Sequence, residues 1–105
     1  MIYNEFKESL NADTPPDGMD KELKALWWDA RGNWDKAHRI IQVMNNTLAA
    51  WVHGYLHRKE GDLSNASFWY TSAGRKMPDM PLEDEWKEIA KAILDNDLRI
   101  ENHFI

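Results

Sequence analysis

The sequence predicts an all-α protein: a single helical domain of tandem antiparallel helical hairpins, with a further helix at each end. Apolar residues recur at helical spacing along most of the 105-residue chain, and no stretch of any length alternates as a strand would. One turn pattern also occurs twice, at residues 32–37 and 61–66, as a glycine, an Asn or Asp, a large apolar residue and then an alanine. Because glycine ends a helix and Asn or Asp caps the next one, each copy predicts a sharp turn between antiparallel helices.

The first half of the chain is expected to hold a short helix and the first hairpin. The short helix lies within residues 2–11, and a linker rich in Pro and Gly completes the segment 1–18. The first hairpin spans residues 19–46, with helices over 20–31 and 34–44. Each of these two helices carries apolar residues at the i, i+3 or i+4 and i+7 positions that form one buried face.

The second hairpin spans residues 47–78, with helices over 48–60 and 63–75. Its first helix is apolar on most sides, which predicts the central and most buried element of the fold. After two prolines, a C-terminal helix is expected over 81–95, where acidic residues in the first turn suit the positive end of the helix dipole. The tail spans residues 96–105, and its part from Leu98 to Ile105 is apolar enough to dock against the rest of the chain.

Composition and charge narrow the classes of function. The chain has a net charge of −5, which argues against nucleic acid as the main partner. Residues 30–77 carry seven basic and three acidic residues, a net charge of +4, between acidic ends. This basic middle could bind anions, or the end helices could pack beside it. We expect no cofactor, because no glycine-rich phosphate loop or nucleophile elbow is present.

The predicted location is the cytoplasm. The N-terminus lacks the basic start and apolar stretch of a signal peptide, and the absence of cysteine fits a reducing compartment. The longest apolar run, Leu48 to Val52, is too short to cross a bilayer, so no membrane partner is expected.

The hairpins resemble the tetratricopeptide repeat, a motif of about 34 residues built from two antiparallel helices. Aligned on Gly61, the second hairpin has small or aromatic residues at the packing positions and a closing proline: Gly54, Ala66, Tyr70, Ala73 and Pro78. The first hairpin lacks the closing proline but keeps several of these features: Ala25, Trp28, Gly32, Trp34 and Ala37. The resemblance implies a right-handed array of hairpins with a concave face lined by the first helix of each.

Residues 27–38 and 51–62 also look like an uncharacterised bacterial family of small helical proteins. This second resemblance implies a bacterial protein and the same helical fold, and it implies no activity.

The concave face implied by the repeat resemblance would present Asp29, Trp51, Tyr55, Arg58 and Lys59. Aromatic and basic groups together could hold an acidic or C-terminal peptide, so the leading hypothesis is a non-enzymatic module that binds a protein or peptide, or forms a homodimer. In the alternative, Trp51 and Tyr55 pack against a neighbouring helix. A third hypothesis is that the end of the helix at Arg58 and Lys59 binds a small anion.

The rival hypothesis is a metal-dependent or His-based hydrolase-like enzyme centred on histidines. His53 and His57 are four residues apart and leave one helix face together, and His38 on the preceding helix could approach them. With Asp29, Asp35 or Glu60, three imidazoles would suffice to hold a divalent metal. The same histidines could instead fill a polar-lined core, or His57 could serve acid–base chemistry with Asp29 or Glu60.

Overall fold

The computed structural model describes the backbone through residue 103 and the side chains through residue 96. The described residues form helices and no strand, which confirms the all-α prediction. The helices are α1 (Tyr3–Ser9), α2 (Lys21–Ala30), α3 (Trp34–Gln42), α4 (Thr47–Glu60), α5 (Leu63–Ser72) and α6 (Leu82–His103).

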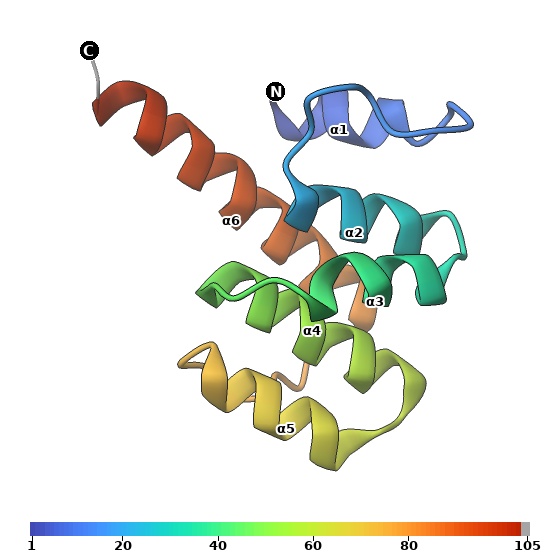
Figure 1. Ribbon diagram of the computed structural model, residues 1–105, viewed down its shortest axis with the longest axis vertical. Helices are drawn as coiled ribbons and strands as arrows, with labels where there is room; N and C mark the ends of the chain where they lie inside the picture. The colour runs from blue at the N-terminus through green and yellow to red at the C-terminus, as the bar shows by residue number, and fades with distance from the viewer. Residues whose placement is uncertain (104–105) are drawn as a thin grey trace.

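Figure 1 shows how the helices are arranged around α4. The chain reverses after α2 and again after α4, so that α3 packs against α2 and α5 packs against α4. Helix α4 also packs against α2, α3 and α6, while α6 crosses behind the hairpins and contacts α1 near the chain's start. All nine residues from Ala49 to His57 are buried, as expected for the central helix.

The two repeated turns have the same local geometry. Gly32 and Gly61 adopt φ angles of 82° and 87°, a left-handed conformation that side chains other than glycine's rarely tolerate. After each glycine, the next amide donates to the carbonyl five residues earlier, at 2.9 and 3.0 Å. The side chains of Asn33 and Asp62 then accept from the amide three residues ahead, at 3.1 and 3.3 Å. Each turn therefore ends one helix and begins the next.

Aromatic side chains join the terminal helices to the hairpins. Trp86 of α6 stacks on Phe6 of α1, with ring centroids 5.4 Å apart. Its indole N–H donates to the carbonyl of Leu26 in α2 at 3.0 Å. One bulky residue thus buries a large apolar area and satisfies a buried carbonyl at the junction of three helices.

Three helix ends differ from the sequence-based expectation. Helices α3 and α5 end at Gln42 and Ser72, two and three residues early, and α6 continues to His103. Between residues 82 and 103 there is no Gly or Pro to stop α6. Docking of the tail, predicted for Leu98 to Ile105, lies outside the described side chains. Within the described part of the chain, no helix is both long and apolar enough to cross a membrane.

Candidate functional site

The five residues predicted for peptide binding lie mostly inside the fold. Asp29, Trp51 and Tyr55 are only 2%, 5% and 2% exposed, Arg58 is half-buried, and Lys59 is exposed. The Asp29 carboxylate accepts hydrogen bonds from the Tyr55 hydroxyl and the Lys59 ammonium, both at 2.9 Å. Burial, followed by the nearby Asp29 carboxylate, raises the pKa of Tyr55 well above its usual range. These contacts tie α4 to α2.

Trp51 and Arg58 instead meet Glu85 of α6, which is 1% exposed. The Glu85 carboxylate accepts from the Trp51 indole at 3.0 Å, from Arg58 Nε at 3.0 Å and from the Tyr70 hydroxyl at 2.7 Å. Arg58 Nη2 lies 3.0 Å from the same carboxylate but is out of line for a second hydrogen bond. Both cations proposed for anion binding are therefore paired with carboxylates of this chain, and peptide binding at these five residues stays a prediction.

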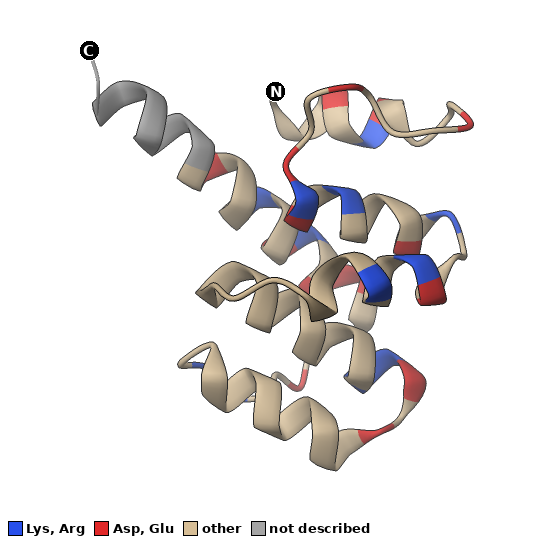
Figure 2. Ribbon diagram, viewed as in Figure 1, with Lys and Arg blue, Asp and Glu red and all other residues tan. Residues whose placement is uncertain are grey.

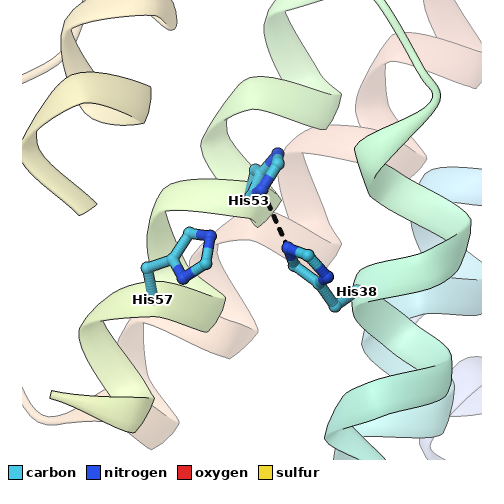
Figure 3. A group of neighbouring side chains, drawn as sticks. All are labelled: His38, His53 and His57. Atoms are coloured by element: carbon cyan, nitrogen blue, oxygen red, sulfur yellow. Dashed lines mark hydrogen bonds between the residues drawn. The ribbon is translucent and has the colours of Figure 1, made fainter. Parts of the chain in front are cut away.

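The structure brings the three predicted histidines together between α3 and α4 (Figure 3). His38 comes from α3, and His53 and His57 come from adjacent turns of α4. The Nε2 atoms of His38 and His53 are 3.2 Å apart, and one ring nitrogen from each of the three lies within 4.8 Å of the others. We call this group the histidine cluster.

Two tryptophans enclose the histidine cluster. The Trp34 ring stacks on His38 at a centroid distance of 4.9 Å, and the Trp69 ring stacks on His53 at 3.9 Å. The Trp34 indole also donates to the carbonyl of Leu56 at 2.8 Å, which holds α3 against α4 beside the cluster. The imidazoles thus sit between rigid aromatic walls that limit their rotation.

Burial keeps two members of the histidine cluster, His53 and His38, uncharged at neutral pH. His53 is 5% exposed, and burial, together with the neighbouring His57 and His38, lowers its pKa to about 4. Burial and His57 also lower the pKa of the half-buried His38. A neutral imidazole offers one ring nitrogen with a free lone pair, the form required of a metal ligand or a general base.

Glu60 orients the third histidine. His57 Nδ1 lies 2.6 Å from the Glu60 carboxylate, and because a carboxylate only accepts, Nδ1 carries the proton. In the neutral ring, this arrangement leaves the lone pair on Nε2. A carboxylate holding the Nδ1–H of an imidazole is the usual outer partner of a metal-binding histidine. Of the other two predicted carboxylates, Asp29 is bound elsewhere and the exposed Asp35 acts only at a distance, by favouring the charged form of His38.

A second potential ligand set shares His57. One ligand atom each from His57, Glu60 and Asp62 also lie within 4.8 Å of one another. Asp62, however, already caps α5 through its side chain, and Glu60 already accepts from His57. The histidine cluster is therefore the better candidate site.

The aromatic walls were not identified from the sequence. Trp34 precedes His38 by four residues, a spacing that places two side chains on one helix face, so this contact has a sequence signal. Trp69 contacts His53 from a different helix, and no spacing along the chain predicts that contact.

Comparisons of the chain with protein-family models, with curated proteins and with solved structures found no match. We therefore infer function from the geometry of the site.

Proposed function

We propose that the protein binds one divalent transition-metal ion through His38, His53 and His57. The observation that carries this proposal is the convergence of three imidazole nitrogens. Two nitrogens that bind zinc at about 2.0–2.1 Å in tetrahedral geometry lie about 3.3 Å apart. The Nε2 atoms of His38 and His53 share a hydrogen bond of 3.2 Å, so they already lie at about the spacing that zinc requires. The ring nitrogen of His57 lies within 4.8 Å of the other two and would move closer to complete the set.

The ligand set favours a particular class of ion. Neutral imidazoles suit Zn²⁺, Cu²⁺, Ni²⁺ and Co²⁺, whereas Mg²⁺ and Ca²⁺ prefer oxygen ligands. Burial lowers the pKa of both His38 and His53, which reduces competition from protons at neutral pH. The Glu60 contact fixes His57 in the tautomer that leaves Nε2 free.

Three protein ligands leave a fourth position on a tetrahedral ion for water or a small ligand. In zinc sites of this kind, the metal lowers the pKa of its bound water to about 7 and so supplies a nucleophile. The hydrolase-like alternative predicted from the sequence would use this chemistry, with the histidine cluster as its centre.

Metal binding is tested on chelator-treated protein. We expect one Zn²⁺ or Co²⁺ per chain by titration calorimetry and elemental analysis, and a tetrahedral Co²⁺ absorption spectrum. Single changes His38→Ala, His53→Ala and His57→Ala should each weaken binding at least tenfold, because each removes a ligand. His103→Ala, which changes the only other histidine, should leave binding unchanged. Substoichiometric zinc in the unaltered protein, or equal loss in His103→Ala, would contradict the proposal.

Binding of a protein or acidic peptide, homodimer formation and the tetratricopeptide-like arrangement of the hairpins remain predictions from the sequence. Velocity sedimentation of the pure protein tests the homodimer. The contacts of the described residues give these roles no support comparable to the convergence of the histidines.

A further inference from the structure

A cavity of about 320 Å³ adjoins the histidine cluster at His53. It lies where the loop after α3, the first turns of α4 and the end of α5 meet. Its lining is Met44, Asn45, Asn46, Thr47, Ala49, Ala50, His53, Trp69 and Ser72. The volume is within the range of small-ligand pockets.

One nitrogen of His53 is free to serve this cavity. Its Nε2 faces His38, and Figure 3 shows the other ring nitrogen on the side of the ring away from His38 and His57. Among the described residues, no side chain or carbonyl bonds to this Nδ1, although the side chain is 95% buried. His53 lines the cavity, and Nδ1 is not among the fully enclosed side-chain atoms that lack a partner. The nitrogen therefore keeps some exposed surface, and a partner in the cavity can reach it.

The N-terminus of α4 borders the same cavity, where Thr47 belongs to the lining. Asn46 caps the helix by accepting from the Ala49 amide at 2.8 Å, and its own amide group donates to Glu22 at 2.9 Å. The amides of Thr47 and Leu48, ahead of the capped one, have no partner within the helix. The dipole of this 14-residue helix places partial positive charge at the same end.

The cavity carries no formal charge. Figure 2 shows no charged residue in α5 and none in the first part of α4. The charged residues of α4 all lie at its C-terminal end, at Arg58, Lys59 and Glu60. A helix N-terminus contributes about half a positive charge, which suits a monoanion and cannot neutralise a dianion such as phosphate. The apolar wall formed by Met44, Ala49 and Trp69 suits a short hydrocarbon tail.

We propose that this cavity binds a small organic carboxylate, whose oxygens accept from His53 Nδ1–H and from the first amides of α4. The proposal extends the metal-binding function to a ligand of the same site. When Nε2 of His53 binds a metal, the ring proton must reside on Nδ1, which makes Nδ1 a donor. A carboxylate bound there makes the imidazole a better metal ligand. Metal and carboxylate therefore strengthen each other's binding by the same factor.

The test uses acetate, benzoate and inorganic phosphate as probes on zinc-free and zinc-loaded protein. Amide resonances are followed by ¹⁵N NMR and affinities by calorimetry. We expect saturable shifts at Thr47 and Leu48 with the two carboxylates, no saturable shifts with phosphate, and carboxylate affinity at least about fivefold higher with zinc. Ser72→Leu fills the cavity and should abolish the shifts. Ser64→Leu, on the same helix outside the cavity, should preserve them.

The outcomes separate the two proposals. Stoichiometric zinc binding without carboxylate shifts at Thr47 and Leu48 overturns the cavity site and leaves metal binding intact. Carboxylate binding that Ser72→Leu does not weaken places the ligand on the metal alone and likewise overturns it. Equal carboxylate affinity with and without bound zinc overturns the coupling. If the chain binds no zinc, the metal proposal fails, and carboxylate shifts at α4 then support the cavity site by itself.

Discussion

At the residue scale, the molecule keeps two carboxylates inside by surrounding them with donors. Glu85 accepts from an indole, a hydroxyl and a guanidinium, and Asp29 accepts from a hydroxyl and an ammonium. An isolated buried charge is costly, whereas one paired and fully hydrogen-bonded is tolerated. The tyrosine hydroxyls in these groups are consequently fixed as donors in the folded state.

This arrangement predicts how the protein responds to alkali. Burial and the adjacent carboxylates raise the pKa of Tyr55 and Tyr70 above their ordinary value of 10.0. Above pH 10 the unfolded chain loses these protons and the folded chain keeps them, so stability falls as pH rises. We expect tyrosinate absorbance from both residues to appear together with loss of the helical circular dichroism signal. If two tyrosines ionise near pH 10 while the circular dichroism signal of the helices is unchanged, the prediction is wrong.

The same residues show what the sequence could and could not reveal. Periodicity correctly placed Trp51, Tyr55 and Arg58 on α4, yet it could not say which element covers them. Glu85 was expected only to suit the dipole of α6, because the crossing of α6 over α4 depends on contacts between residues 27 and 34 positions apart. The spacing of His53 and His57 was visible, since their meeting is local to one helix. The approach of His38 depended on how α3 packs.

At the element scale, local chemistry explains why the turns were predictable. Glycine and a capping Asn or Asp act within six residues, so the turns at 32–33 and 61–62 lie where the sequence places them. The end of α3 was less predictable because no residue in 42–44 forbids another helical turn. Helix α5 stops before Gly74, which has a φ of 72°, and the Arg75 amide then donates to the Tyr70 carbonyl at 2.9 Å. This is the same glycine cap as at the two repeated turns, and the expectation of a helix to residue 75 overlooked it. The length of α6 was underestimated because Asn96 and Asp97 only weakly oppose a helix.

The packing of α5 on α4 gives a prediction about Gly54. A Cβ built at this position would lie 3.1 Å from the Tyr70 ring, which is buried and held by Glu85. Alanine normally stabilises a helix interior by about 0.5–1 kcal/mol, but overpacking costs about 1–3 kcal/mol. We expect Gly54→Ala to destabilise the protein by about 1–2 kcal/mol in urea denaturation.

A double-mutant cycle identifies the cause. In a Tyr70→Leu background the ring is gone, so adding Gly54→Ala should be neutral or stabilising. If Gly54→Ala raises the urea midpoint of the otherwise unaltered protein, the close approach of Gly54 to the Tyr70 ring does not lower the stability of the alanine variant.

At the scale of the whole molecule, the histidine cluster joins the two hairpins. His38 belongs to the α2–α3 hairpin, while His53 and His57 belong to the α4–α5 hairpin. A metal ion bound to all three would cross-link the hairpins in the folded state only. The ion would therefore stabilise the fold as a whole, by an amount that depends on its free concentration.

Bound zinc should raise the free energy of unfolding by a few kcal/mol. At a free Zn²⁺ concentration 100 times the dissociation constant, linkage gives about 2.7 kcal/mol. For a chain of this size, 1 kcal/mol corresponds to about 4–8 °C, so the melting temperature should rise by about 10–20 °C over chelator-treated protein. His38→Asn leaves two histidines on one helix, which can hold an ion without linking the hairpins, and most of the rise should vanish. An equal rise in His38→Asn would show that the ion stabilises α4 alone, and that the two hairpins are held together without it.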